Sequence, residues 1–132
     1  MKFKHFLVFT MAFALVALCT SCNKSSENKI LGKWRAVSYQ YRTSEKPEWE
    51  TRTPPADQVS ITEFRADGTC YKYENDELED KGYWSYDKDN QKLTIDGVTY
   101  DIVKLSSKEM VLDTKSDGDD WAEVQINLEK VK

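Results

Sequence analysis

From residue 30 onward the chain repeats one pattern, short runs of strand-forming residues separated by turn residues. Tyr, Val, Ile, Thr and Trp dominate these runs, and such residues favour the pleated, half-buried surface of a sheet. We find no helical periodicity in this region. The pattern predicts eight strands, at about 31–42, 58–66, 69–75, 77–86, 91–96, 98–105, 109–115 and 120–131.

The turn residues between the predicted strands indicate how the strands are connected. Asp67-Gly68 and Asp96-Gly97 are two-residue hairpin signals, because both positions accept a positive φ at low cost. Asn75-Asp76, 87–90 and 116–119 are turn clusters of the same kind. Hairpins therefore join strands two to eight into an antiparallel meander. Closure of such a meander removes exposed edges, so we predict an all-β, eight-stranded up-and-down barrel.

Two further features qualify this meander. The last predicted strand alternates cleanly, with Ala122, Val124, Ile126 and Leu128 on one face and Glu123, Gln125 and Asn127 on the other. The connection 43–57 is the one that exceeds hairpin length, and it contains Trp49 and three prolines. Long connections are uncommon in compact domains and are often functional.

The first 22 residues have the pattern of a secretory signal. Residues 1–5 are basic, and the apolar run 6–18 is shorter than the roughly 20 residues that cross a bilayer. Thr20 and Ser21 supply small residues before a cleavage site. We therefore predict a signal peptide at 1–21, a polar tether at 22–29 and one barrel domain at 30–132.

Charge and residue types exclude several functions for the part of the chain after the signal. His5, the only histidine, lies in the signal, so histidine-based nucleophilic catalysis and imidazole metal sites are excluded. Removal of residues 1–21 takes away Lys2 and Lys4 and no acid, which moves the net charge from −4 to −6. Such a domain offers no basic stripe for nucleic acid. We expect no enzyme activity, no cofactor and no metal.

Three weaker motifs do not change this interpretation. Cys19 and Cys22 form a C-x-x-C spacing, but Cys19 would leave with the signal, so a redox site is not expected. Cys70 is then the lone thiol, and a lone cysteine in a strand is usually a small buried hydrophobe. The sequence 113–118 imitates a calcium loop, but Lys115 occupies a ligand position, which favours a plain hairpin turn.

Two sets of residues carry a family resemblance. The run Leu18-Cys19-Thr20-Ser21-Cys22 resembles a bacterial lipobox, which implies that Cys22 is lipidated and anchors the protein in a membrane. Gly32-x-Trp34, the stretch 64–69 and Gly82-x-Trp84 are similar to small lipocalin-like lipoproteins of Bacteroides-type bacteria. The resemblance covers about residues 30–131. It implies a monomeric outer-membrane lipoprotein whose barrel has a small apolar cavity and a long first loop over its mouth.

The resemblance also implies roles for individual residues. Trp34 would pack across the closed end, against a cation from the last strand, for which only Lys130 or Lys132 is available. Gly32, Trp34, Gly82 and Trp84 are accordingly structural. The predicted ligand contacts are Tyr39, Tyr41, Trp49 and Trp121.

We weighed this ligand-binding barrel against a different class of function. In the alternative the barrel is filled by its own side chains, and Trp49, Trp121 and the loops contact a glycan or a protein. The volume of the cavity separates the two hypotheses. The loops at the mouth carry an excess of acidic residues, so we expect neutral or cationic ligands to be preferred over anionic ones.

Overall fold

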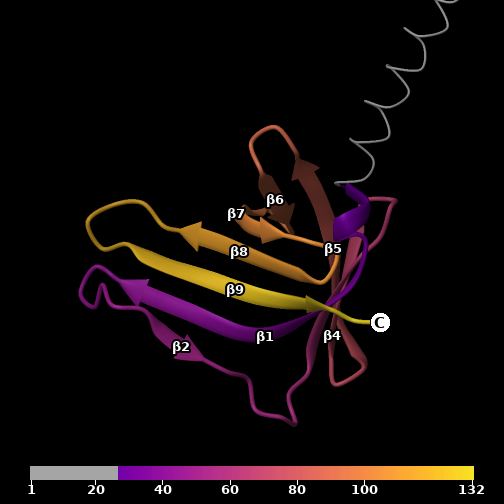
Figure 1. Cartoon of the computed structure of the whole chain (residues 1–132), viewed down its shortest axis with the longest axis horizontal. Helices are drawn as coiled ribbons and strands as arrows, with labels where there is room; N and C mark the ends of the chain where they lie inside the picture. The colour runs from indigo at the N-terminus through magenta and orange to yellow at the C-terminus, as the bar shows by residue number, and fades with distance from the viewer. Residues whose placement is uncertain (1–26) are drawn as a thin grey trace, which may run out of the picture.

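The computed structural model describes residues 27–132, which form one antiparallel sheet that closes on itself (Figure 1). The predicted signal and Cys22 lie outside the described residues. In chain order the strands are β1 (Gly32–Thr43), β2 (Glu50–Arg52), β3 (Ser60–Phe64), β4 (Thr69–Glu74), β5 (Glu77–Asp87), β6 (Lys92–Ile95), β7 (Val98–Leu105), β8 (Glu109–Lys115) and β9 (Ala122–Lys130).

Pairing of β1 with β9 closes the barrel. These two strands pair along almost their whole length, from Trp34 opposite Lys130 to Thr43 opposite Ala122. Every strand from β3 to β8 pairs with the next one in sequence, as expected for a meander joined by hairpins. The predicted eight-stranded antiparallel barrel is confirmed, and β1 together with β3–β9 forms it.

The strand β2 flanks the barrel and was not predicted. The first part of β1 pairs with β3, from Gly32 opposite Phe64 to Arg35 opposite Ile61. Farther along, Tyr39–Tyr41 pairs with β2 instead. The prediction of a strandless connection over 43–57 is therefore wrong at 50–52. The backbone groups on this edge of β1 have lost β3 as a partner, and β2 satisfies them.

A bulge in β1 decides which of its side chains face the interior. The register against β9 shifts between Ala36 and Ser38, so Val37 is the extra residue. Without the bulge, strict alternation from Trp34 and Ala36 would turn Tyr39 to the outside. With it, Tyr39 and Tyr41 face inward, and the intervening residues Gln40 and Arg42 face outward.

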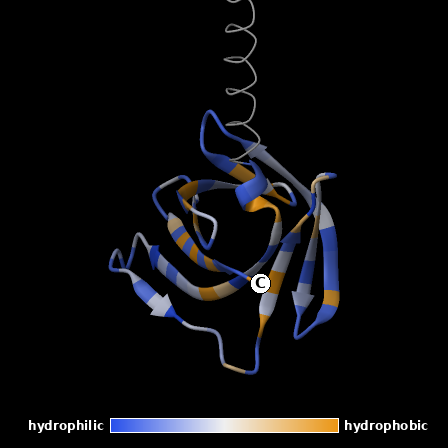
Figure 2. Ribbon diagram, turned by 45° about the vertical axis from the view of Figure 1, so that its right-hand side comes forward, coloured by the Kyte–Doolittle hydropathy of each residue, from blue (hydrophilic) through white to orange (hydrophobic). Residues whose placement is uncertain are grey.

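The hydrophobic core occupies one end of the barrel, which we call the closed end. Phe64 and Trp84 meet there edge to face, with ring centroids 5.4 Å apart. Figure 2 shows the apolar residues recurring between polar ones along the strands, as the alternation requires. The buried core consists of Ile30, Trp34, Phe64, Cys70, Trp84, Leu93, Met110, Leu112 and Leu128.

A single helical turn over residues 27–30 covers the closed end. The last residues assigned above to the tether, 27–29, belong to this turn. Ile30 is fully buried, and its carbonyl oxygen accepts a hydrogen bond of 2.8 Å from Nε1 of Trp34. The turn therefore plugs the barrel beneath Trp34. No helix within residues 27–132 is long and apolar enough to span a bilayer.

Candidate functional site

A cavity of about 220 Å³ lies inside the barrel, above the core. We call the end of the barrel opposite the closed end the mouth. There the loops 44–49 and 116–121 lie side by side, and the backbone nitrogen of Ser44 donates to the carbonyl of Trp121 across 2.9 Å. Pockets for drug-sized ligands measure about 300–1,000 Å³, so this cavity suits a smaller molecule.

The floor of the cavity is apolar. Its side chains come from alternate positions on five strands, so they all point into the barrel. Three of these side chains are buried, and the other three are partly buried and pack against the core; the buried ones are Phe64, Leu112 and Leu128. The floor residues are Ala36, Phe64, Ile95, Leu112, Ile126 and Leu128.

Hydroxyl and charged side chains line the rest of the cavity. Oγ of Ser60 donates a hydrogen bond of 2.6 Å to the carboxylate of Glu74, and Lys72 lies two residues before Glu74 on the same face of β4. Burial raises the pKa of the Tyr39 hydroxyl, with a further contribution from Glu74, and burial also raises the pKa of Tyr100. Both phenols are therefore neutral at physiological pH and can donate to a polar group of a ligand.

Tyr41 holds β2 at the mouth and is not a lining residue of the cavity. Its hydroxyl donates to the carboxylate of Glu50 and accepts a hydrogen bond of 2.9 Å from Nη2 of Arg52. The guanidinium of Arg52 also lies over the Tyr41 ring, 4.7 Å from its centroid. Because both partners belong to β2, Tyr41 fixes that strand to β1.

Trp49 and Trp121 lie around Arg42, which faces away from the cavity. The guanidinium carbon of Arg42 is 4.3 Å from the centroid of the Trp49 ring and 5.5 Å from that of Trp121. Nζ of Lys115 lies over Trp121 as well, at 4.3 Å. The Trp49 ring thus already contacts one cation, and the Trp121 ring contacts two. Of the four predicted ligand contacts, Tyr39 is the one that the structure brings to the cavity.

Sequence reasoning did not identify Ser60, Lys72, Glu74 or Tyr100 as cavity residues. Lys72 and Glu74 lie two and four residues after Cys70, so they share its face of β4. Cys70 is buried in the core at 1% exposure. The prediction that Cys70 is a buried hydrophobe is confirmed. Applying the alternation of β4 from Cys70 onward would have placed both charged side chains on the inner face.

The two Gly-x-Trp motifs have structural roles. Trp34 is fully buried, and Trp84 is 7% exposed and donates from Nε1 to the carbonyl of Arg65 across 2.8 Å. Gly32 has a φ of +113°, which an L side chain rarely adopts. A Cβ at Gly82 would lie 2.8 Å from Oδ1 of Asp96. Both glycines therefore allow a close approach of neighbouring groups.

Lys130 is the last-strand cation that packs on Trp34. Its Nζ lies 4.6 Å from the centroid of the Trp34 ring, donates to the carbonyl of Leu31, and donates to the carbonyl of Lys29 across 3.2 Å. Burial lowers the pKa of this ammonium group. Lys130 thus ties the helical turn to the barrel, and it is the cation from the last strand that was expected against Trp34.

Replacing Lys130 by alanine is expected to lower the free energy of unfolding by about 1–3 kcal/mol, because two carbonyl groups lose their donor and Trp34 loses its cation. Urea denaturation followed by far-UV circular dichroism measures the change. Lys132→Ala is the matched control, since Lys132 is exposed. Equal midpoints for the two variants would contradict the role given to Lys130.

The described part of the chain shows no arrangement typical of a metal centre. Within residues 27–132, no group of three or more His, Cys, Asp or Glu side chains is placed to hold an ion. Cys70 is a free, buried cysteine, and burial raises the pKa of its thiol. The thiol is therefore protonated at neutral pH and poorly nucleophilic.

Comparison with known proteins identifies the family. No curated protein sequence matches the chain. Among solved structures, the chain is similar to a deswapped triple mutant of bovine odorant binding protein, at 17% identity and a TM-score of 0.45, over 78% of this chain and 74% of that one. The family model of the lipocalin-like domain matches residues 30–112, more than half of the chain. The chain therefore belongs to the lipocalin-like domain family.

Proposed function

We propose that the protein is a lipid-anchored binding protein of the bacterial envelope that holds a small amphipathic molecule inside its barrel. The observation that carries this proposal is the cavity of about 220 Å³, with an apolar floor and with hydroxyl and charged groups on one side. Apolar walls with a few placed polar groups are typical of sites that bind small molecules. Membership of the lipocalin-like family agrees with this role.

The cavity favours ligand binding over the alternative of a barrel filled by its own side chains. Tyr39, Ser60 and Glu74 line an open volume and have capacity for further hydrogen bonds. The position of Arg42 beside Trp49 and Trp121 gives less support to a surface that stacks on a glycan, because the cation already contacts both rings.

The anchoring part of the proposal rests on Cys22 and the lipobox-like run before it. Two or more acyl chains are needed for stable attachment, and a lipidated cysteine would supply them. We place the protein in the outer membrane on the resemblance to Bacteroides-type lipoproteins. The function proposed for the barrel does not depend on this location.

Ala36→Phe is expected to weaken binding of hexan-1-ol by about tenfold or more, because the added ring occupies the floor of the cavity. Chemical-shift changes in ¹⁵N-labelled protein measure the affinity. Gln40→Phe is the matched control, since Gln40 is on the same strand and faces outward. Equal affinities in folded Ala36→Phe and Gln40→Phe proteins would place the binding site elsewhere.

The same titration tests the expected charge preference. Hexylamine should bind at least as tightly as hexan-1-ol, and hexanoate more weakly, because the loops at the mouth carry an excess of acidic residues. Inside the cavity, Lys72 and Glu74 offset each other's charge. Native mass spectrometry of protein purified from its own envelope should then reveal a retained small molecule. A barrel that retains nothing and binds none of the three amphiphiles would contradict the proposed function.

A further inference from the structure

Two carboxyl groups are buried on the outer face of the barrel, away from the cavity. Asp113 follows the cavity residue Leu112, and Glu123 lies three residues before the cavity residue Ile126, so alternation turns both outward. Outward-facing acids are usually solvated, yet Asp113 is 7% exposed and Glu123 is 9% exposed. A layer of side chains on this face therefore shields them from water.

The hydrogen-bond partners of the two carboxyl groups differ. Oε1 of Glu123 accepts two hydrogen bonds from Arg42, 2.9 Å from Nε and 2.7 Å from Nη2. Oδ2 of Asp113 is buried and receives no hydrogen bond from any donor in residues 27–132. A buried carboxylate oxygen without a donor is unfavourable. In the register of β8 against β9, Asp113 lies opposite Gln125 and is the diagonal neighbour of Glu123 on the same face, so a proton between the two carboxyl groups would satisfy it.

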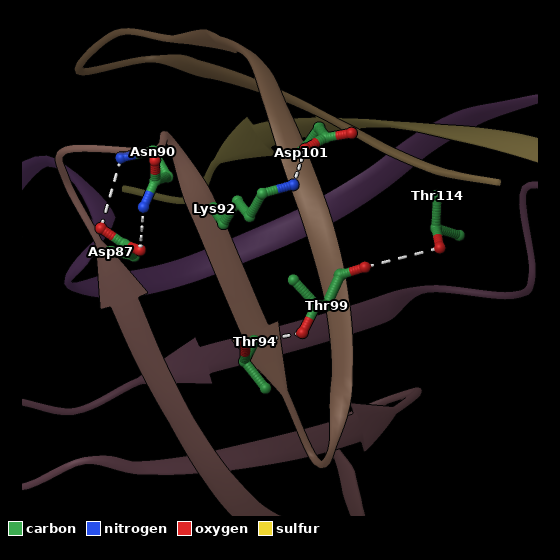
Figure 3. Close-up of polar contacts among 7 residues, drawn as sticks. All are labelled: Asp87, Asn90, Lys92, Thr94, Thr99, Asp101 and Thr114. Atoms are coloured by element: carbon green, nitrogen blue, oxygen red, sulfur yellow. Dashed lines mark hydrogen bonds and ion pairs between the residues drawn. The ribbon is translucent and has the colours of Figure 1, made fainter.

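The charges around the two carboxyl groups are balanced when the pair holds one proton. With one proton the pair carries one negative charge, which the bound guanidinium of Arg42 balances. Lys115 and Gln125 are the other polar neighbours on β8 and β9. From β7, Asp101 faces the pair, but Nζ of Lys92 lies 2.7 Å from its Oδ1 and compensates its charge (Figure 3).

Arg42 connects the carboxyl pair to the segment 44–52, which we call the strap. The strap includes β2 and reaches the mouth, and the ring of its Trp49 packs on the guanidinium of Arg42 at 4.3 Å. At its start, Ser44 donates from the backbone to the carbonyl of Trp121. The contacts thus run across the sheet from Asp113 on β8 to Glu123 on β9 and Arg42 on β1, and Trp49 packs on Arg42.

We propose that one proton shared by Asp113 and Glu123 fastens the strap through Arg42 and Trp49, and that loss of this proton loosens it. Two ionised carboxylates side by side repel each other and require hydration. Water reaches them only when the layer over the pair, with Arg42 and Trp49, is displaced. The ambient pH therefore sets how firmly the strap is held at the mouth.

The direction of the pH dependence follows from the two carboxyl groups. Burial, and then the hydrogen bond and charge of Glu123, raise the pKa of Asp113 above its ordinary value. The stability that its proton contributes is complete below the ordinary pKa and is lost as the pH rises through the raised value. The hydrogen bond from Asp113, and then Arg42, lower the pKa of Glu123, so its contribution is lost as the pH falls through the lowered value. The strap is held best between these two limits.

Carboxyl ¹³C NMR and amide hydrogen exchange of the protein test this proposal. The Asp113 carboxyl should titrate above its ordinary range. Above that titration, the protection factor of the Ser44 amide should fall by up to about tenfold per pH unit. In Asp113→Asn, whose amide donates to Glu123 as the protonated acid does, protection should not depend on this titration. Asp101→Asn should behave like the wild type.

Two results would overturn the proposal. A carboxyl of Asp113 that titrates in or below its ordinary range would show that no proton is shared. Protection of Ser44 that changes with pH in the same way in the wild type and in folded Asp113→Asn would show that the pair does not control the strap. The wild-type titration decides the first point even if Asp113→Asn does not fold.

Discussion

Trp34→Ala is expected to lower the free energy of unfolding by about 3–5 kcal/mol, the usual range for truncating a buried aromatic side chain. Trp34 is fully buried, its Nε1 donates to Ile30 across 2.8 Å, and Lys130 packs on its ring. The variant thus loses core contacts, the hydrogen bond to the helical turn and the ring on which the half-buried Lys130 packs. Because small domains are stable by about 5–15 kcal/mol, this is a large fraction of the total.

Thermal unfolding followed by circular dichroism measures this loss. A decrease of roughly 15 °C or more in Tm is expected for a domain of this size. Trp49→Ala is the matched control, since Trp49 is 38% exposed and should have a much smaller effect. A Trp34→Ala protein with the Tm of the wild type would show that Trp34 is not part of the core and would make it a candidate ligand contact.

Cys22→Ala is expected to abolish membrane attachment or to leave an uncleaved precursor. Each buried methylene of an acyl chain contributes about 0.8 kcal/mol to membrane binding, so loss of all chains removes the anchor. Labelling of cells with radioactive palmitate, followed by fractionation of membranes, measures both acylation and location.

Cys19→Ala is the control for this experiment, because Cys19 is a poor candidate for lipidation. A lipobox that ended at Cys19 would have Leu18 at the position that requires a small residue. The Cys19→Ala protein should be acylated and processed like the wild type. If Cys22→Ala still incorporated palmitate and remained in the membrane fraction, Cys22 would not be the lipidated residue.

The barrel was predictable because its evidence is local. Turn residues and period-two alternation depend on neighbours in sequence, and hairpins convert them directly into the pairing of successive strands. Asp96-Gly97 is an example, since it forms the predicted turn, with a φ of 51° at Asp96 and 85° at Gly97. Closure followed from the number and length of the strands.

The cavity was harder to predict because alternation does not say which face is inside. Tyr71 and Tyr73 have the period of an apolar face, yet they lie outside, where Arg65 and Lys33 pack on their rings at 3.9 and 5.5 Å. Lys72 and Glu74 share the face of the buried Cys70 and line the cavity, which Tyr73 also borders. Aromatic rings can pair with cations at the surface, so the chemical type of a side chain does not by itself show which face of a strand lies inside.

Long-range contacts account for the other differences. The bulge at Val37 and the strand β2 depend on pairing across the sheet, and no local signal in 43–57 indicates a strand. On β9, Glu123 is on the polar face as predicted, but its burial depends on Arg42, which lies 81 residues away in sequence. Alternation assigns a residue to one face of its strand, but it does not show which side chains cover that face.

The position of the two chain ends determines how the protein can be attached to a membrane, a fusion partner or a surface. The helical turn enters at the closed end, and Val131 leaves there, held by a hydrogen bond of 2.9 Å from its nitrogen to the carbonyl of Lys33 (Figure 1). Cys22 precedes Glu27 by five residues, which span at most about 18 Å. A lipid anchor at Cys22, a fusion partner at the C-terminus or a sensor surface coupled to either end would therefore leave the mouth unobstructed.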